Sequence, residues 1–346
     1  MIQEAIRRVT AGEDLTENAA QQIVTAMMEG EATGPQIAAL LVGLRMKGET
    51  TDEILGIVRA MRRRMTPVRV SADGLVDTCG TGGDAHVFNE GRTGTFNIST
   101  VAAFVAAGAG CRVAKHGNRA MSSRCGSADL LSALGVSIET SPAAAARCID
   151  EIGIGFLYAP LYHPSLRHAA TARREIGIRT VLNLAGPLVN PAGARRQLLG
   201  VFDARLTEPL ARVLSELGST HCMVVHGSDG LDEISITGPT RVTELREGRI
   251  HTYSIASNEF GLSTSKLADL QGGDETVNAK IAMQVLNGDP GPTRDVVLLN
   301  AGAAAYVAGR CDSLRQGLTL AADSIDSGRA LGKLEALRDC LSGMSE

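Results

Sequence analysis

The chain has 346 residues, long enough for two packed domains, and its 44% hydrophobic content excludes a largely disordered protein. Its formal net charge of −4 gives no general attraction to nucleic acid or anionic membranes. Since no apolar run reaches the roughly 18 residues of a membrane-spanning helix, a globular protein is favoured over a membrane protein.

The seven cysteines are scattered and include no C-x-x-C pair. Such a set is typical of reduced thiols in a cytoplasmic protein rather than of a disulfide framework. Residues 1–8 carry no apolar segment of a secretory signal. A cytoplasmic location is therefore expected.

The first 66 residues carry only helical patterns, with apolar residues recurring every three or four positions. Helix starts are marked by Thr16-Glu17, by Gly34-Pro35 and by a capping box over 50–53. We expect most apolar stripes to form the core of a small domain, with the stripe over 40–44 also available for contact between subunits. The arginines at 62–64 are expected to form a solvated helix end.

From residue 72 to residue 161 the pattern changes to alternating strands and helices. Strands are predicted at 75–77, 111–114, 136–138 and 154–157, and helices at 101–109, at 129–134 and after Pro142. Such alternation predicts βαβ units in a largely parallel sheet, whose ligands bind in loops at the carboxyl ends of the strands.

A second helical stretch begins near Ala159, and strand and helix patterns then return. Strands are predicted at 197–202, 222–226 and 234–237, and a Glu-Gly turn within 241–255 predicts an antiparallel hairpin. Helices fill the remainder of the chain, and the apolar segment 297–308 is expected to be buried.

The segment 77–129 carries the motifs that point to chemistry. It begins with Gly-Thr-Gly-Gly-Asp at 80–84, where glycines permit close backbone approach and can turn N–H groups toward one point. The motif lacks the Gly-Lys-Ser/Thr ending of a P-loop, and its spacing does not fit the dinucleotide fingerprint. Taken alone, it predicts a turn more strongly than a phosphate site.

Further polar residues follow the glycine motif. Asn97 and Ser99 precede an apolar helix, whose N-terminus favours anions. Lys115 and Arg119, in the next loop, supply full positive charges. Two anion cradles and two cations suit a ligand with more than one phosphate.

Three strings carry a family resemblance: GTGGD at 80–84, FNIST at 96–100 and KHGNR at 115–119. With the serines that follow, they resemble the anthranilate phosphoribosyltransferase family in order and nearly letter for letter. The resemblance extends over almost the whole chain, from 39–50 to Asp232-Glu233 and beyond.

The resemblance implies an α/β fold of the nucleoside phosphorylase and phosphoribosyltransferase type. A small all-helical domain, 1–66 with 162–186 returning to it, would lie beside a larger α/β domain, 72–161 and 187–346, with a mostly parallel central sheet. The resemblance also implies a homodimer formed through the helical domain.

The implied reaction belongs to tryptophan biosynthesis. The phosphoribosyl group of 5-phosphoribosyl 1-pyrophosphate (PRPP) passes to the amine of anthranilate, giving N-(5-phosphoribosyl)anthranilate and pyrophosphate. The substrate-binding positions carried over from the family are Gly80, Gly82, Gly83, Asp84, Thr95, Asn97, Ile98, Ser99, Thr100, Lys115, His116, Gly117, Asn118, Arg119, Ser122, Ser123, Ser127, Tyr162 and Arg173. Thr95 follows a longer loop, 85–94, than the family usually has there.

Asp232 and Glu233 match the family's magnesium pair, with Ser99 as a further ligand, and two Mg²⁺ ions per active site are expected. Asn118 and Arg173 match contacts to anthranilate, and an arginine fork suits its carboxylate. Pro160 and His163 are expected to line the acceptor tunnel with His116 and Tyr162.

No catalytic nucleophile is expected. The aromatic amine of anthranilate is neutral at pH 7, so its lone pair can attack without a dedicated base. Catalysis would come from positioning and charge stabilisation.

Two alternative functions stay open. A pyrimidine nucleoside phosphorylase shares the architecture and a glycine-rich phosphate loop, but it lacks the KHGNR string and the Asp-Glu pair. A non-catalytic relative that binds nucleic acid needs a basic surface, which the net charge of −4 disfavours.

Overall fold

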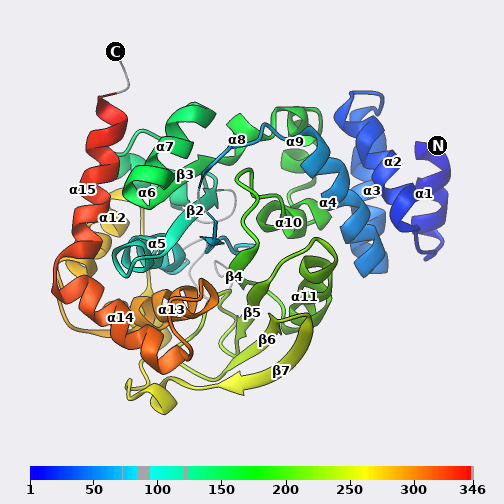
Figure 1. The fold of residues 1–346 in the computed structure, drawn as a ribbon. Helices are drawn as coiled ribbons and strands as arrows, with labels where there is room; N and C mark the ends of the chain where they lie inside the picture. Colours follow the sequence, from blue (N-terminus) through cyan, green and yellow to red (C-terminus); the bar gives the residue numbers. More distant parts are fainter. Residues whose placement is uncertain (72, 84–93, 121–123, 344–346) are drawn as a thin grey trace.

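In the computed structural model the described residues are 1–71, 73–83, 94–120 and 124–343. They form a helical lobe beside a larger α/β lobe, and the N-terminus lies at the outer edge of the helical lobe (Figure 1). Among these residues, no helix has both the length and the apolar character needed to cross a membrane.

The helical lobe begins with α1 (Ile2–Thr10), α2 (Glu17–Met28), α3 (Gly34–Lys47) and α4 (Thr51–Arg64). The hydroxyls of Thr16, Thr33 and Thr50 accept hydrogen bonds from the N–H groups of the first turns of α2, α3 and α4. These caps satisfy donors that a helix N-terminus leaves free, which explains why the helices begin where the sequence predicts.

A later part of the chain packs on the same lobe. It contains α8 (Ala159–Tyr162), α9 (Arg167–Ile176) and α10 (Val181–Ala185). Helix α9 packs against α2 and α3, and α10 packs against α3 and α4 (Figure 1). Their buried side chains, among them Ala169, Ala172 and Leu182, join the hydrophobic core of α1–α4. The chain therefore leaves the helical lobe, forms part of the sheet and returns.

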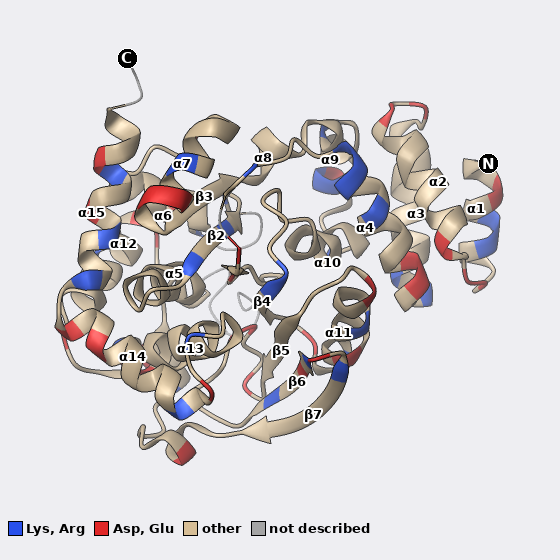
Figure 2. Cartoon of the chain, in the orientation of Figure 1, with Lys and Arg blue, Asp and Glu red and all other residues tan. Residues whose placement is uncertain are grey.

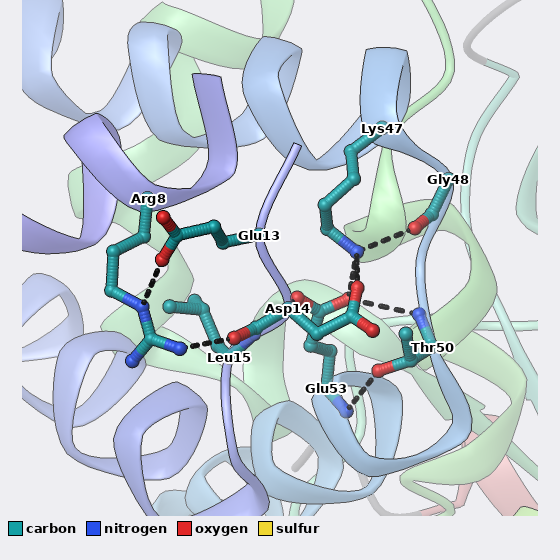
Figure 3. Close-up of polar contacts among 8 residues, drawn as sticks. All are labelled: Arg8, Glu13, Asp14, Leu15, Lys47, Gly48, Thr50 and Glu53. Carbon is teal, nitrogen blue, oxygen red and sulfur yellow. Dashed lines mark hydrogen bonds and ion pairs between the residues drawn. The ribbon is translucent and has the colours of Figure 1, made fainter. Parts of the chain in front are cut away.

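A buried polar network joins three segments of the helical lobe (Figure 3). Glu53, on α4, has no exposed side-chain surface and accepts hydrogen bonds from Leu15 N, Thr50 N and Lys47 Nζ. Lys47 also donates to Asp14 at 2.7 Å. Burial opposes the charge of Lys47, but its bonds to Asp14 and Glu53 outweigh burial and raise its pKa above the ordinary value.

The α/β lobe is built on a seven-stranded sheet with the order β3-β2-β1-β4-β5-β6-β7. Strands β1 to β5 run parallel, and β6 and β7 extend the sheet as an antiparallel hairpin. The strands are β1 (Leu75–Asp77), β2 (Arg112–Gly117), β3 (Ile154–Tyr158), β4 (Arg196–Gly200), β5 (His221–Gly227), β6 (Thr240–Arg246) and β7 (Arg249–Ile255).

Helices cover both faces of the sheet (Figure 1). The helices of this lobe are α5 (Ile98–Gly108), α6 (Ser127–Ala133), α7 (Pro142–Ile152), α11 (Thr207–Glu216), α12 (Glu275–Leu286), α13 (Pro292–Val307), α14 (Leu314–Asp326) and α15 (Arg329–Ser342). Alternate side chains of β5 face opposite ways: Met223 and Val225 join the core around α5 and α13, while Cys222 and Val224 join the core shared with α11 and the helical lobe.

Short 3-10 turns link several elements. They lie at Pro164–Leu166, Gly186–Leu188, Ala204–Leu206, Ser257–Phe260 and Leu267–Leu270.

The order of the strands places one loop at a reversal of the sheet. From β1 the chain continues to β2 and β3 on one side, whereas β4 lies on the other side of β1. In open α/β sheets, the carboxyl ends of the strands at such a reversal form the crevice that binds ligands. The glycine motif follows β1 at this position.

Some local predictions were wrong. The segments 136–138 and 234–237 are not strands and do not belong to the seven-stranded sheet. The helix end at 62–64 is only partly solvated: Arg63 is exposed, whereas Arg62 is half-buried, its Nε donates to Leu188 O at 2.8 Å, and burial lowers its pKa. The apolar stripe over 40–44, expected also to be available for subunit contact, is buried in the lobe's own core.

Candidate active site

The floor of the candidate site is fixed by Asp77, the last residue of β1. Its Oδ1 accepts hydrogen bonds from Cys79 N and His116 N, and its Oδ2 accepts one from Asn190 Nδ2 at 2.7 Å. Burial raises the pKa of the Asp77 carboxyl to about 6, against the opposing influence of Lys115 and these hydrogen bonds. Asp77 thereby ties the start of the glycine loop to β2 and to the connection that returns from the helical lobe.

The glycine loop passes close to its neighbours at Gly80, where the absence of a Cβ leaves room. At Gly80, a Cβ would lie 2.9 Å from Asp232 Oδ2 and 3.1 Å from Gly200 O. Thr81 N donates to Gly200 O at 2.8 Å, which holds the loop against the end of β4. Any larger residue at position 80 would push the loop away from the Asp232 carboxylate.

The N-terminus of α5 forms the second wall of the site. Ser99 N donates to Glu233 Oε1 at 3.2 Å, so the helix end already faces one of the predicted metal ligands. Asn97 is the N-cap residue, but its side chain makes no cap bond. It instead donates to Cys125 O and accepts from Asn278 Nδ2, which fixes the approach to the helix.

Lys115 joins the two walls. Its side chain is buried at the carboxyl end of β2, where Nζ donates to Thr78 Oγ1 at 3.1 Å and to Ser99 Oγ at 3.3 Å. Thr78 Oγ1 in turn donates to Ser99 O. A buried ammonium group held between the glycine loop and α5 strengthens the attraction of both for anions.

The loop after β2 is folded on itself by Asp129. Its carboxylate accepts hydrogen bonds from Ala120 N, Gly126 N and the guanidinium of Arg119. Ser127 Oγ bonds to the backbone of Asn118. The cation predicted at Arg119 is thus present at the site, and its present partner is a carboxylate.

Two histidines meet beneath the cleft. His116, on β2, and His163, after α8, have ring centroids 5.2 Å apart, and both side chains are almost completely buried. Burial lowers the pKa of His116 to about 3 and that of His163 to about 4. Both imidazoles are therefore neutral at physiological pH and present no charge to a ligand.

The opposite wall belongs to the helical lobe, where α9 carries a concentration of arginines (Figure 2). Arg173 is partly buried and Arg174 is exposed, and both border the cleft. Burial lowers the pKa of Arg173 below its ordinary value, although the group stays charged. Arg179, beyond the end of α9, donates to Gly83 O at 2.8 Å across the cleft.

These walls enclose a cleft of about 830 Å³ between the two lobes. Its lining contains most of the positions predicted from the sequence: Gly80, Gly82, Gly83, Thr95, Asn97, Ile98, Ser99, Thr100, Lys115, His116, Gly117, Asn118, Arg119, Ser127, Arg173, Asp232 and Glu233. His163, expected at the acceptor tunnel, also lines it. Segments far apart in the sequence therefore converge on one volume.

Tyr162 is a correction to the predicted set. Its side chain has no exposed surface and packs among Leu157, Ile149 and Val68, and it does not line the cleft. The helical turn that presents His163 to the cleft directs its neighbour into this core. Pro160 does not line the cleft either.

Other predicted positions cannot be placed. Asp84, Ser122, Ser123 and the long loop 85–93 lie outside the described residues.

Three residues that position the site, Arg179, Phe202 and Asn190, are not among the positions predicted from the sequence. Arg179 and Asn190 lie in the connecting segment, but only the fold brings them to the glycine loop and to Asp77. The one available signal was their position in a segment that already contained a predicted site residue, Arg173.

The carboxylates of Asp232 and Glu233 fit a hard divalent cation. They are adjacent, the closeness of Asp232 to Gly80 depends on the absent Cβ, and Glu233 reaches the N-terminus of α5 beside the Ser99 hydroxyl. Mg²⁺ is commonly held by one or two carboxylates together with substrate phosphates. This donor set therefore suits Mg²⁺ bound jointly with a phosphorylated ligand.

A second group of metal-ligand types lies below the loop. Ligand atoms of Asp77, Cys79 and His116 fall within 4.8 Å of one another. Both oxygens of Asp77 already accept hydrogen bonds, and burial raises the pKa of the Cys79 thiol, which disfavours the thiolate that binds metals. We therefore assign these residues to the structure of the loop.

Two family models together match nearly the whole chain. The helical bundle domain of a glycosyl transferase family matches residues 3–65, and the a/b domain of a glycosyl transferase family matches residues 72–331. The gap between the two matches, at residues 66–71, falls between α4 and β1, whereas the returning helices α8 to α10 lie within the stretch that the a/b model matches.

Curated relatives are similar over almost their full length. The chain is 56% identical over 337 residues to the anthranilate phosphoribosyltransferase of Moorella thermoacetica, covering 97% of each chain. It is 55% identical over 334 residues to that of Symbiobacterium thermophilum, covering 96% of each.

Solved structures agree. The crystal structure of anthranilate phosphoribosyltransferase from Thermus thermophilus matches with a TM-score of 0.89 and 44% identity, covering 98% of this chain and 99% of that one. The enzyme from Saccharomyces cerevisiae, in complex with PRPP and Mg, matches with a TM-score of 0.89 and 25% identity, covering 99% of this chain and 98% of that one.

Proposed function

The chain belongs to the anthranilate phosphoribosyltransferase family, and we propose that its cleft transfers the phosphoribosyl group of PRPP to the amine of anthranilate. The products are N-(5-phosphoribosyl)anthranilate and pyrophosphate, and the reaction is a step of tryptophan biosynthesis. The observation that carries this proposal is the convergence of three elements in one cleft. These are the glycine loop, the N-terminus of α5 with Lys115, and the Asp232–Glu233 pair.

The donor, PRPP, is assigned to the α/β wall. The glycine loop and the N-terminus of α5 offer backbone N–H groups, and Lys115 and Arg119 offer positive charge. Such groups suit the pyrophosphate and 5-phosphate of PRPP. When a phosphate binds, Ser99 N would donate to a phosphate oxygen instead of to Glu233. Arg119 would likewise donate to the phosphate instead of to Asp129.

We assign two Mg²⁺ ions to this donor site, with Asp232, Glu233 and Ser99 as the protein ligands. The Saccharomyces cerevisiae relative has been solved in complex with PRPP and Mg, which supports the assignment of Mg²⁺ to this site. When bound, Mg²⁺ would neutralise charge on the departing pyrophosphate. The role of the two carboxylates is to hold the ions beside the glycine loop, where the leaving group would lie.

The acceptor, anthranilate, is assigned to the space between His116, His163 and α9. Arg173 would pair with its carboxylate, because a guanidinium binds a carboxylate bidentately, and Asn118 would add a hydrogen bond. The two histidines, neutral because they are buried, can face an aromatic ring without repelling Arg173. A relative from Saccharomyces cerevisiae has been solved with 4-fluoroanthranilate, which supports an anthranilate-shaped site.

The chemistry needs no catalytic nucleophile. The donor residues hold the ribose so that its C1–pyrophosphate bond can break through an oxocarbenium-like state. The acceptor residues hold the neutral amine on the opposite face of C1, and the amine then loses a proton to solvent. The lobes contribute positioning and charge stabilisation, which together can lower a barrier by several kcal/mol.

We also propose that the protein is a cytoplasmic homodimer joined through the helical lobe. Met46, on α3, is 83% exposed and Met1 is 63% exposed, so this lobe presents apolar surface that a second copy could cover. All seven cysteines are free, as is usual in a reducing compartment.

Three assays on the purified chain distinguish this function from its alternatives. With PRPP and Mg²⁺, we expect anthranilate to be converted to a product of the mass of N-(5-phosphoribosyl)anthranilate. With inorganic phosphate and thymidine or uridine, we expect no release of base, and with duplex or single-stranded DNA we expect no binding. Base release without any anthranilate conversion would instead identify a nucleoside phosphorylase.

A further inference from the structure

Arg179 connects the acceptor side of the cleft to the donor loop. It lies six residues after Arg173, beyond Gly177, whose left-handed backbone (φ +67°) ends α9. Its Nη2 donates to Gly83 O at 2.8 Å. The guanidinium also lies over the ring of Phe202, with Cζ 4.7 Å from the ring centroid. One side chain of the connecting segment thus contacts both the glycine loop and the end of β4.

The geometry of Gly83 is matched to this arginine. Its φ of +135° is a conformation that favours glycine, and a Cβ at this position would lie 2.4 Å from Arg179 Nη1. The guanidinium occupies the space that a side chain would otherwise fill. Glycine at position 83 is therefore required both by the backbone conformation and by the contact with Arg179.

A short chain of hydrogen bonds closes the connection. Phe202 N donates to Thr81 Oγ1 at 3.2 Å, and Thr81 N donates to Gly200 O at 2.8 Å. Arg179 therefore reaches the glycine loop directly, at Gly83, and indirectly, through Phe202 and Thr81. We call these four residues, Arg179, Gly83, Thr81 and Phe202, the Arg179 clamp.

We propose that Arg179 is a positioning residue that couples the binding of the two substrates. This inference rests on the proposed function, in which the glycine loop holds PRPP and Arg173 holds anthranilate. Anthranilate would fix the segment that carries Arg173 and Arg179, and PRPP would fix the loop that carries Gly83. Because the Arg179 clamp joins these two segments, fixing one segment restricts the other, so each substrate reduces the entropy that the other must lose, and the coupling is reciprocal.

Calorimetry measures this coupling without turnover. Inorganic pyrophosphate with Mg²⁺ serves as a non-reacting partner for the donor site, and the Kd of anthranilate is measured with and without it. For the wild-type protein we expect anthranilate to bind at least about fivefold more tightly in the presence of pyrophosphate, the lower end of common coupling energies.

The variant Arg179→Met keeps an unbranched side chain to cover Phe202 but has no donor for Gly83 O. We expect its coupling factor to fall to about one, with the Kd of anthranilate alone changed by less than about twofold. Arg179→Lys, which keeps one donor, should recover part of the coupling. The matched control is Arg167→Met. Arg167 is an exposed residue of α9 outside the cleft lining, so this variant should retain the wild-type coupling factor.

Wild-type coupling in a folded Arg179→Met protein would overturn the proposal, as would a wild-type protein that turns over but shows no coupling. If Arg179→Met does not fold, the comparison of Arg179→Lys with wild type decides in the same way. Absence of any wild-type turnover would instead overturn the proposed function, and the proposal with it.

Discussion

At the scale of single residues, the cleft depends on charges held at fixed positions. Lys115 is buried at the end of β2, yet its ammonium group donates to both Thr78 and Ser99. It therefore supplies positive charge where the glycine loop meets α5. Because the group is largely removed from water, its attraction for a phosphorylated ligand is stronger than that of a surface lysine.

The Asp232–Glu233 pair should control activity through the metal. We expect the double variant Asp232→Ala, Glu233→Ala to fold and to lose at least about a hundredfold in kcat/KM, because charge on the departing pyrophosphate is no longer neutralised. The rate is measured over a titration of Mg²⁺. The control, Asp339→Ala, removes an exposed carboxylate on α15 that is outside the cleft. Wild-type turnover of the double variant at low Mg²⁺ would remove these residues from the metal site.

Arg173 should control affinity for the acceptor. We expect Arg173→Ala to raise the KM for anthranilate at least about tenfold, because a desolvated carboxylate would lose a charge-assisted pair. The KM for PRPP should change far less, and Arg167→Ala on the same helix should change neither value. An equal rise in both KM values would mean that Arg173 supports the cleft as a whole rather than the acceptor.

The buried histidines should make stability depend on pH. The folded-state pKa values of His116 and His163, about 3 and about 4, lie below the ordinary value of 6.5. Their contribution to stability is therefore complete above pH 6.5 and is lost as the pH falls from 6.5 toward 4 for His163 and toward 3 for His116. Each histidine adds a slope of up to about 1.4 kcal/mol per pH unit in that window.

The variant His163→Asn, which has no titrating ring, isolates one of these slopes. We expect its free energy of unfolding, measured by urea denaturation, to fall less steeply than that of the wild type between pH 6 and pH 4.5. The carboxyl groups titrate in both proteins, so they cancel in the comparison. Parallel curves would show that His163 is protonated equally in the folded and unfolded states.

At the scale of secondary-structure elements, the helical lobe depends on a buried charge pair as well as on its apolar core. Glu53 joins the starts of α2 and α4 to the end of α3 (Figure 3). Breaking a buried pair by removing one partner is costly, because hydrogen-bond donors and a positive charge are left without their acceptor.

We expect Glu53→Ala to lower the free energy of unfolding by about 3 kcal/mol, because Lys47, Leu15 N and Thr50 N would all lose a partner inside the lobe. The control, Glu4→Ala, breaks an exposed ion pair with Arg7 and should change the free energy of unfolding by less than about 0.5 kcal/mol. Both are measured by urea denaturation followed by circular dichroism. Equal effects of the two variants would contradict the role given to Glu53.

At the scale of the whole molecule, the path of the chain explains why the cleft lies between the lobes. The chain forms four helices, then three strands, and returns to the helical lobe through α9 and α10 before it completes the sheet. The donor elements thus belong to the sheet, whereas Arg173 and Arg179 belong to the returning segment. We propose that residues 1–66 and 162–186 form one domain, a division that the packing of α9 on α2 and α3 supports.

Much of this arrangement could be predicted from the sequence, because its signals are local. The caps at Thr16 and Thr50, the helix after Asn97 and the hairpin with its Glu-Gly turn are each specified within a few residues. The segments 136–138 and 234–237 resemble strands, but strand formation requires a pairing partner, and local sequence does not supply one.

The site could also be predicted only as far as local sequence specifies it. The motif strings identified the glycine loop, Lys115 and the Asp-Glu pair, which all border the cleft. The wrong placement of Tyr162 and the missed contact of Arg179 with Gly83 both depend on which way a side chain points after the chain folds. Such directions follow from packing between distant segments, and neither residue type nor spacing encodes them.

The central claim is that this cleft transfers the phosphoribosyl group of PRPP to anthranilate and releases pyrophosphate. Following anthranilate fluorescence and pyrophosphate release together, with PRPP and Mg²⁺ present, tests it most directly. We expect fluorescence to fall and pyrophosphate to appear in equal molar amounts, and neither change to occur when PRPP is omitted. Pyrophosphate release without loss of anthranilate, or no change in either at saturating substrate, would contradict the account.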